Sequence, residues 1–244
     1  MSSPQTKIAL VTGATRGIGL ETVRQLANAG IHVLLAGRDR GKAVEAALRL
    51  QAEGLSVEAI ALDVANDDSI AAAAAEVARK HGHLDVLVNN AGVLRDDVAR
   101  KPSEQSLAAW RETFDTNVFG VVATTQAFLP LLKKAPAARI VNVSSLLGSI
   151  AANADPASPI YDFKVPAYNV SKSAVNAWTV QLAHELRDTA IKVNAVHPGS
   201  VKTDMNAYGD LSVEDGARTS VRMALLPADG PSGGFVHFED TLPW

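Results

Sequence analysis

Short runs of apolar, often β-branched residues alternate along this chain with longer stretches whose apolar positions recur with helical period. Most of the short runs are apolar on both sides, as expected for parallel strands covered by helices on both faces. They predict seven strands, over 8–12, 32–36, 56–62, 84–89, 139–144, 191–196 and 234–238. The longer stretches predict six helices, over 16–29, 40–53, 68–81, 107–134, 167–188 and 213–226. The pattern therefore predicts an α/β fold, a doubly wound seven-stranded parallel sheet with helices on both faces.

Composition and charge limit the functions that this chain can have. The 244 residues are 47% hydrophobic and 20% charged, which suits a single globular domain spanning 1–244. A net charge of −3 argues against a nucleic-acid partner, and no apolar run is long enough to span a membrane. The polar stretch 1–7 lacks the pattern of a secretory signal, so we expect a cytoplasmic protein.

Cysteine and histidine usage restricts the metal chemistry. The chain has no cysteine, which excludes disulfides, thiolate nucleophiles and cysteine-based metal sites. The six histidines are scattered and form no H-E-x-x-H motif, and we expect His81 and His83 to be solvated residues of a loop. We therefore predict no catalytic metal.

A glycine-rich segment follows the first predicted strand and leads into a helix. It reads T-G-x-x-x-G-x-G from Thr12 to Gly19, a spacing different from the common G-x-G-x-x-G. Glycines let the backbone approach a pyrophosphate, and the free N–H groups at a helix start attract that anion. The strand, turn and helix context predicts a Rossmann-type dinucleotide site rather than merely a tight turn.

Tyr168 and Lys172 stand four residues apart in a predicted helix and so lie on one face of it. A nearby cation favours phenolate over phenol, so we expect Lys172 to lower the pKa of Tyr168 and to make proton exchange near neutral pH feasible. Alone, this spacing is common on helix surfaces.

Together with other motifs, this pair gives the chain a resemblance to the short-chain dehydrogenase/reductase family. The resemblance covers essentially the whole chain. The glycine segment matches the family pattern in full. Further matches follow in chain order: Asn89, Asn90, Ala91 and Gly92 after the fourth strand, Asn117 in the long helix, Ser145 after the fifth strand, Tyr168 with Lys172, and Pro198 with Gly199 after the sixth strand. The resemblance implies four catalytic residues: Asn117, Ser145, Tyr168 and Lys172.

The resemblance also implies a role for each of the four. Tyr168 would protonate the substrate's carbonyl oxygen, and Ser145 would orient that oxygen. Lys172 would hold the nicotinamide ribose and act on Tyr168, while Asn117 would support a water that connects Lys172 to solvent. The neighbouring Ser144 competes with Ser145, but the second serine of such a pair is the active one in the family.

The resemblance and the strand ends together imply a set of cofactor contacts. They are Gly13, Thr15, Arg16, Gly17, Ile18, Gly19, Arg38, Asp63, Val64, Asn90, Ala91, Gly92, Tyr168, Lys172, Pro198, Gly199, Val201 and Thr203. Asp63 and Val64 would contact the adenine, with an exposed loop aspartate as the alternative for Asp63. Asn89 could equally stabilise its strand.

Cofactor preference depends on the end of the second strand, where NAD-binding folds usually carry an acid for the ribose 2′-hydroxyl. Here Arg38 stands at that end and no acid precedes Asp39. Arg38 and Arg16 could hold a 2′-phosphate, so we predict NADPH rather than NADH, with two solvated arginines as the alternative.

The stretch between Ser145 and Tyr168 is longer than in most of the family and resembles, though shorter, the insert of its carbonyl reductases. This insert, 148–165, is expected to be irregular but ordered, with Tyr161 and Phe163 either walling the substrate site or anchoring the loop. A short mobile flap is expected over 200–211. Tyr161 competes poorly with Tyr168 because no lysine follows it by four residues.

An NADPH-dependent carbonyl reductase of small aldehydes or ketones is the function that these features favour. The alternatives are a biosynthetic 3-ketoacyl reductase, whose acidic carrier would need a basic patch such as Arg95, Arg100 and Lys101, and a non-catalytic NADPH sensor. Relatives commonly associate through the helices predicted over 107–134 and 167–188, so a homodimer or homotetramer is expected. A monomer is the alternative, because the insert could obstruct that surface.

Overall fold

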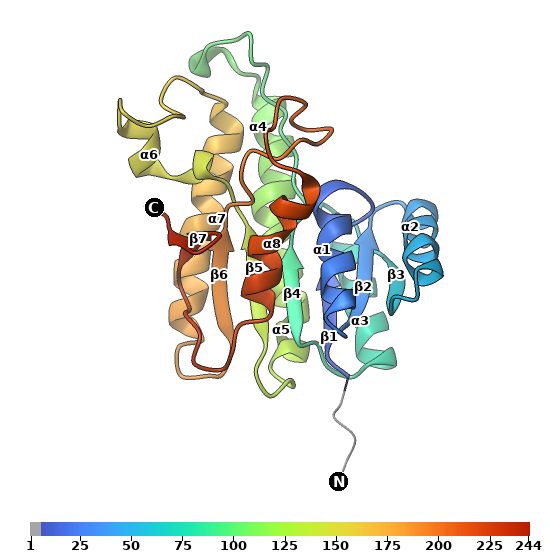
Figure 1. The fold of residues 1–244 in the computed structure, drawn as a ribbon. Coiled ribbons are helices and arrows are strands. Elements are labelled where there is room, and N and C mark those ends of the chain that lie inside the picture. The colour runs from blue at the N-terminus through green and yellow to red at the C-terminus, as the bar shows by residue number, and fades with distance from the viewer. Residues whose placement is uncertain (1–5) are drawn as a thin grey trace.

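The computed structural model describes residues 6–244, through which one twisted, mostly parallel sheet runs (Figure 1). Residues 1–5 of the predicted polar start lie outside this part. The strand order is β3-β2-β1-β4-β5-β6-β7-β8, and the sheet confirms the predicted doubly wound α/β fold. The strands are β1 (Ile8–Val11), β2 (His32–Gly37), β3 (Val57–Ala61), β4 (Val86–Asn89), β5 (Arg139–Val143), β6 (Lys192–Val196), β7 (Phe235–His237) and β8 (Asp240–Thr241).

All seven predicted parallel strands are present, and the sheet has an eighth strand that the prediction missed. The short β8 pairs antiparallel with β7 after a turn through Phe238, whose φ of 46° is unusual for a non-glycine residue. Both residues of β8 are exposed, and its sequence, Asp240 and Thr241, has none of the apolar character from which a strand is predicted.

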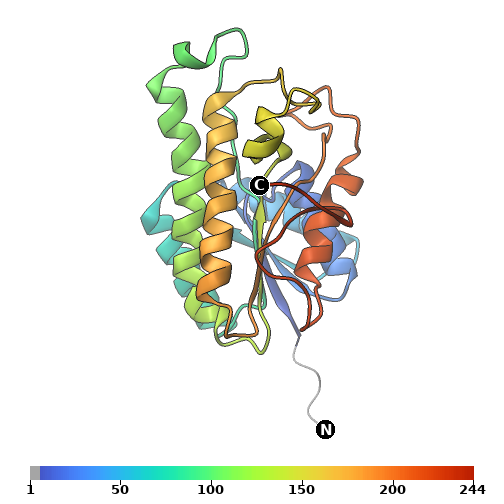
Figure 2. The same ribbon diagram turned by 90° about the vertical axis from the view of Figure 1, so that its left-hand side faces the viewer.

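Two layers of helices cover the sheet, as Figure 2 shows edge-on. One face carries α3, α4, α5 and α7, and the other carries α1, α2 and α8. Their bounds are α1 (Gly17–Asn28), α2 (Arg40–Ala52), α3 (Asp67–Lys80), α4 (Leu107–Phe114), α5 (Gly120–Leu132), α6 (Ile150–Ala154), α7 (Pro166–Glu185) and α8 (Val213–Ala224). Among residues 6–244, no helix has both the length and the apolar character needed to cross a bilayer.

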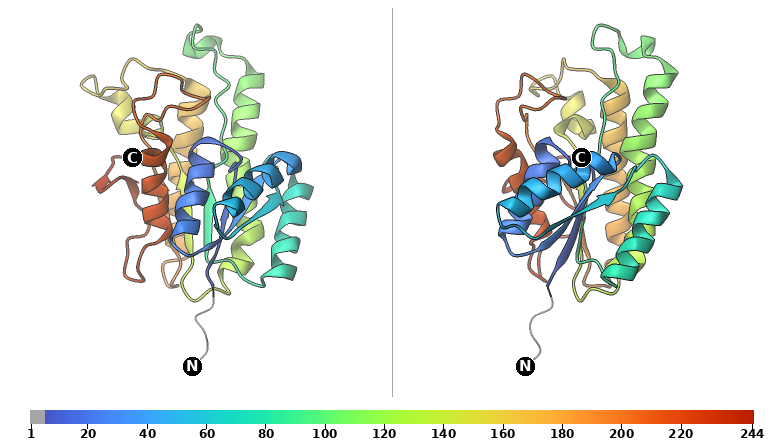
Figure 3. Two further views of the ribbon diagram at one scale, coloured as in Figure 1. Left: turned by 45° about the vertical axis from the view of Figure 1, so that its right-hand side comes forward. Right: turned by 90° about the vertical axis from the view of Figure 1, so that its right-hand side faces the viewer.

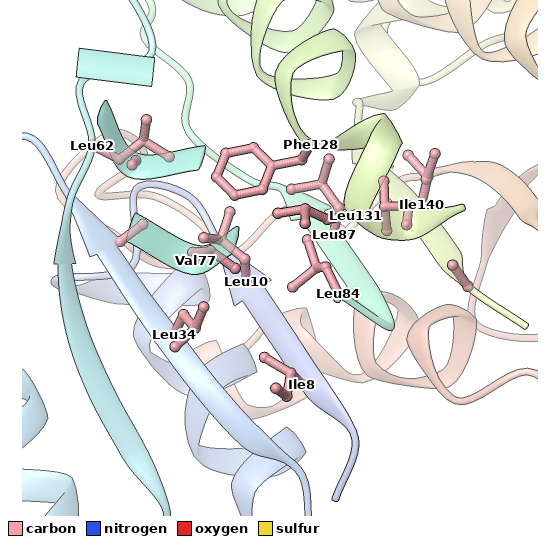
Figure 4. Packing of buried hydrophobic residues seen from close by; sticks show 14 of the residues in the cluster. Ile8, Leu10, Leu34, Leu62, Val77, Leu84, Leu87, Phe128, Leu131 and Ile140 are labelled. Carbon is pink, nitrogen blue, oxygen red and sulfur yellow. The ribbon is translucent and has the colours of Figure 1, made fainter. Parts of the chain in front are cut away.

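Alternation along the strands builds a separate core on each face of the sheet. Leu10 and Leu34 point to the face with α5 and belong to one buried cluster with Phe128 (Figure 4). Val11 and Leu35, the next residues, belong to the core beneath α1 and α8. Because both faces are buried, the strands lack polar alternation, which is why the sequence identified them.

The helix predicted over 107–134 is interrupted by a π-helical turn. This turn, Asp115–Phe119, joins α4 to α5 and contains the fully buried Asn117. Such turns inside an α-helix often occur at functional sites. Periodicity does not reveal one inserted residue in a continuous helix, so the prediction of a regular helix was wrong here.

The insert 148–165 was expected to be irregular, but it contains the short helix α6 after a 3₁₀ turn at Leu146–Gly148. Ser149 caps α6 by accepting a hydrogen bond from the amide of Ala152 at 3.0 Å. The helix is only one turn long and its Ile150 is 69% exposed, so no apolar period marks it. Figure 3 shows that the insert, the flap 200–211 and the loop after β4 gather at the carboxyl ends of the strands.

Candidate active site

The turn between β1 and α1 lies where the strand order reverses, between β1 and β4, and ligands of open α/β sheets bind at such positions. Gly13 and Gly17 have φ angles of 62° and 56°, in the region that favours glycine. A Cβ on Gly13 would lie 2.8 Å from the Cα of Ala91, whereas one on Gly17 would meet only the Thr203 methyl group, at 3.8 Å. Gly13 therefore packs the turn onto the segment after β4, while Gly17 keeps space free beside the helix start.

Helix α1 begins with no side chain bonded to its free N–H groups. Arg16, its N-cap, makes no capping hydrogen bond, and its first turn holds no acid. By contrast, Asp39 and Asn66 cap α2 and α3 through their side chains. An uncapped helix start beside an open glycine attracts an anion such as a pyrophosphate. The predicted contacts Thr15 and Ile18 flank this helix start, both half-buried.

Residues after β4 hold the glycine turn in place. The amides of Asn90 and Ala91 both donate to Thr12 Oγ1 at 3.0 Å, and Asn90 Nδ2 donates to the Thr12 carbonyl at 2.8 Å. Asn89 is buried and donates to Thr125 Oγ1 at 3.0 Å, so its geometry supports the strand-stabilising alternative. The Asn90 side chain thus ties two neighbouring strand ends together.

Tyr168, Lys172 and Ser145 lie together between the end of β5 and the start of α7. Lys172 Nζ is 5.6 Å from the centre of the Tyr168 ring and donates to the Val143 carbonyl at 2.7 Å. The Lys172 side chain is buried, at 4% exposure, whereas Tyr168 is half-buried. A Cβ on Gly92 would lie 3.6 Å from Lys172 Nζ, so the end of β4 also borders this group.

Burial dominates the proton affinities of the pair. It raises the pKa of Tyr168 to about 12, and a hydrogen bond with the Ser145 side chain acts in the opposite direction. Burial also lowers the pKa of Lys172 to about 8. The expected lowering of the Tyr168 pKa by Lys172 was therefore wrong, because the sequence argument considered charge and omitted desolvation.

The two serines after β5 have different surroundings. Ser144 is buried and donates to the Lys172 carbonyl at 3.3 Å, so its hydroxyl supports the backbone of α7. Ser145 hydrogen-bonds the Tyr168 side chain and accepts a bond from the Leu147 amide at 3.2 Å. The geometry therefore brings Ser145, rather than Ser144, to the tyrosine hydroxyl.

Asn117 connects the π-helical turn to two other elements. Its Oδ1 accepts from the Val93 amide at 2.8 Å, and its Nδ2 donates to the Val93 carbonyl at 2.9 Å and to Ser171 Oγ at 3.0 Å. With its side chain satisfied in this way, Asn117 fixes the segment after β4 against α7 beside Lys172.

Sequence reasoning missed Asp96, which positions the start of α7. Its carboxylate accepts from the amides of Ala167 and Tyr168 at 2.8 and 3.0 Å, and its side chain is buried. It caps α7 from a segment far away in sequence, so no local capping motif reveals it.

Replacing Asp96 by Ala is expected to lower the free energy of unfolding by about 2 kcal/mol, because two charge-assisted hydrogen bonds at a helix start are lost. The loosened start of α7 carries Tyr168, so kcat should fall by about tenfold. Urea denaturation and steady-state kinetics measure the two effects. Asp97→Ala, at the exposed neighbouring position, is the matched control, and equal effects in both variants would contradict the capping role.

The residues at the end of β2, where the ribose of the cofactor is expected, have different surroundings. Arg38 is exposed, whereas Asp39 Oδ1 accepts from the Lys42 amide at 3.1 Å and so caps α2. Arg16 pairs with Asp204 of the flap at 2.6 Å, but its side chain is 76% exposed, so the alternative of solvated arginines is not excluded. Val64 is buried and Asp63 half-buried, so the exposed-loop alternative for Asp63 does not hold.

The flap 200–211 folds back over the glycine turn. The remaining predicted contacts on this side begin with Pro198, which is buried, and Gly199, whose φ is 93°. Val201 pairs with Leu211 at the base of the flap, and Thr203 faces Gly17. Its expected mobility stays a prediction.

The aromatic rings of the insert do not anchor it to the core. Tyr161 and Phe163 are 38% and 49% exposed. Asn153 fixes the insert instead, because its Nδ2 donates to the Leu147 carbonyl at 2.8 Å and its own carbonyl accepts from Lys164 Nζ at 2.9 Å. A hollow of about 530 Å³ opens next to the insert, lined in part by Leu146, Ala152, Pro159 and Pro243.

Comparisons with known proteins agree with this arrangement. The family model described as short chain dehydrogenase matches residues 7–211. The chain is 36% identical to (+)-neomenthol dehydrogenase of Arabidopsis thaliana, over 96% of this chain and 97% of that protein. It is 34% identical to a 3-oxoacyl-[acyl-carrier-protein] reductase of Staphylococcus aureus, over 96% and 90%. The solved structure of NADPH-bound carbonyl reductase from chicken fatty liver superimposes with a TM-score of 0.86, at 31% identity, over 99% of this chain and 100% of that one.

Proposed function

Because this chain belongs to the short-chain dehydrogenase family and is an oxidoreductase of CH–OH and C=O groups, we propose that it is an NADPH-dependent carbonyl reductase. Its substrates would be small aldehydes or ketones, which it reduces to alcohols. The observation that carries the proposal is that Tyr168, Ser145 and Lys172 lie together at the carboxyl end of the sheet, near an uncapped, glycine-opened helix start.

The residues present fit a dinucleotide. The free N–H groups of α1 would bind the pyrophosphate where Gly17 keeps space open, and Val64 would border the adenine. When bound, the reduced dinucleotide supplies the hydride. Lys172 would hold the nicotinamide ribose by giving up its bond to the Val143 carbonyl.

Each of the four residues of the proposed site would have its own role in proton transfer to the substrate. Tyr168 donates its hydroxyl proton to the carbonyl oxygen, and Ser145 hydrogen-bonds the same oxygen and fixes its orientation. Lys172 places a positive charge beside the tyrosine. Asn117 would support a water between Lys172 and solvent, along which a proton returns to Tyr168.

NADPH is proposed over NADH because Arg38 is exposed at the end of β2, while the acid next to it is committed to capping α2. Replacing Arg38 by Ala removes a charge-assisted bond worth roughly 1.5–3 kcal/mol, so KM for NADPH should rise about 10- to 100-fold and KM for NADH should hardly change. Arg40→Ala, two residues on and also exposed, is the matched control. A wild-type KM for NADH at or below that for NADPH would contradict the preference.

The alternative enzyme is a 3-ketoacyl reductase. The similarity to the 3-oxoacyl-[acyl-carrier-protein] reductase of Staphylococcus aureus supports this alternative. The basic patch that an acidic carrier would need is largely neutralised, because Arg95 pairs with Glu112 and Arg100 with Asp97. This pairing favours free carbonyl compounds. The sensor alternative has less support, since the tyrosine, lysine and serine are all retained.

A panel of small aldehydes and ketones, with oxidation of NADPH followed by absorbance, tests the proposed function. Steady turnover of several free carbonyl compounds is expected. Turnover restricted to carrier-linked 3-ketoacyl substrates would establish the alternative enzyme, and binding of NADPH without any turnover would establish the sensor.

Association into a homodimer or homotetramer, and a cytoplasmic location, stay predictions. Phe119 and Val170 are 60% and 46% exposed on the helices through which relatives associate. Light scattering distinguishes these assemblies from a monomer, which the insert would favour.

A further inference from the structure

At the amino ends of the strands, opposite the proposed active site, three side chains that could ligate a metal ion come together. His32 is the first residue of β2, Glu58 lies in β3, and His81 is the C-cap of α3. Glu58 pairs with Leu34 across the sheet, so it shares a face with His32, two residues earlier in β2. Helix α3 covers that face and runs back to the same end, which brings His81 alongside.

The expectation of solvated histidines near position 81 was wrong. The side chains of His81 and His83 are only 16% and 12% exposed, and His83 pairs with Asp85 at 3.2 Å. His81 Nε2 is buried and lies 3.4 Å from Glu58 Oε2, without the geometry of a regular hydrogen bond. Because the strand register and α3 bring together residues far apart in the sequence, the scattered histidine positions gave no sign of this cluster.

The three ligand atoms are close to the spacing of a tetrahedral metal site. Glu58 Oε2 lies 3.7 Å from His32 Nε2 and 3.4 Å from His81 Nε2, and the three residues each offer one ligand atom within 4.8 Å of the others. Ligand atoms around tetrahedral Zn²⁺ are roughly 3.3 Å apart, as bond lengths of about 2.0–2.1 Å require. A small adjustment of the His32 and His81 rings would therefore close the site.

Neighbouring groups already orient these ligands. Ser56 Oγ is 2.8 Å from His32 Nδ1, which leaves Nε2 as the free nitrogen. Lys80 bonds Glu58 through the other carboxylate oxygen, Oε1, so Oε2 is free for a metal. The charge of Lys80 is shared with Glu76, 2.7 Å away. Hydrogen-bonded imidazole and carboxylate ligands of this kind are typical of metal sites.

We propose that His32, Glu58 and His81 bind one divalent transition-metal ion, with Zn²⁺ as the ion that this donor set fits best. Two imidazoles and a carboxylate suit zinc, and a water would complete four ligands, since His32 is partly exposed and gives access. The ion would clamp the starts of β2 and β3 to the end of α3. It is remote from Tyr168, so the site is structural, and it does not depend on the proposed reductase activity.

The alternative is an ion-pair cluster in which the histidines merely surround Glu58 and Lys80. Calorimetric titration of the tag-free full-length protein with ZnCl₂ at pH 7.5 distinguishes the two. We expect one equivalent to bind, and Zn²⁺ at about 100 times Kd should raise Tm by about 5 °C or more. Tetrahedral absorption bands with CoCl₂ would give an independent readout of the same ligands.

Single variants identify the ligands. His32→Ala, His81→Ala and Glu58→Gln should each weaken Zn²⁺ binding by more than about 100-fold, and Ser56→Ala by about 10-fold. The matched control is His184→Ala, on the exposed face of α7, which should bind like the wild type. Turnover of carbonyl substrates should be unchanged in all of them. The absence of binding below millimolar Zn²⁺, wild-type affinity in His32→Ala and His81→Ala, or equal weakening in His184→Ala would overturn the proposal.

Discussion

Replacing Tyr168 by Phe is expected to lower kcat for carbonyl reduction by roughly 10²- to 10⁴-fold, the range attributed to a positioned general acid. The ring keeps its place on α7 and loses only the hydroxyl that bonds Ser145. Binding of NADPH should stay within about twofold of the wild type, because the glycine turn and Arg38 are untouched. Single-turnover reduction and fluorescence titration with NADPH measure the two quantities separately.

Tyr161→Phe is the matched control, because it removes the same hydroxyl from an exposed ring of the insert. It should retain near wild-type turnover. If Tyr168→Phe reduced carbonyl compounds at the wild-type rate, or if Tyr161→Phe lost the same factor, the proton donor would have to be reassigned.

The pKa of Tyr168 decides how readily the phenol can give up its proton. With a pKa near 12, caused by burial, the phenol is protonated at neutral pH and ready to donate to a carbonyl oxygen. Alcohol oxidation would instead need the phenolate as a base. A phenol with so high a pKa is a weak acid, so a positive charge beside the ring is needed to bring its pKa closer to the operating pH.

The sequence predicted those parts of the fold and site that depend on local chemistry. The apolar runs identified seven of the eight strands, because burial on both faces removes polar residues from them. The glycine turn was recognisable because the local backbone conformation requires glycine at particular positions, such as Gly13 and Gly17 with their positive φ. Spacing on one helix likewise brought Tyr168 and Lys172 together.

The features that the sequence did not predict depend on contacts between distant segments. Asp96 caps α7 from the loop after β4, and His81 meets Glu58 only through the strand register and the path of α3. Desolvation, which sets the direction of the Tyr168 pKa, likewise depends on how much of the chain packs around the ring. Pattern reasoning contains none of these quantities.

Replacing Lys172 by Met is expected to abolish most turnover and yet to stabilise the protein without cofactor. Burial lowers the Lys172 pKa from 10.5 to about 8, so keeping this side chain charged in the fold costs roughly 3 kcal/mol at neutral pH. Met has a similar length and no charge. After the lost bond to the Val143 carbonyl is subtracted, we expect a gain of about 2 kcal/mol, or a Tm higher by about 4 °C or more.

The pH dependence separates this effect from simple repacking. Below pH 8 both states of the wild type carry the Lys172 proton, but between about pH 8 and 10 the unfolded state binds more protons, so stability rises with pH. Above pH 10 the raised pKa of Tyr168 acts in the opposite direction. Denaturation of Lys172→Met should lack the rise from pH 8 to 10, and the exposed control Lys134→Met should keep it. If Lys172→Met were less stable than the wild type and kept its pH profile, the buried charge of Lys172 would not destabilise the fold. Any stability that the site loses for the sake of its chemistry would then have to be sought in other residues.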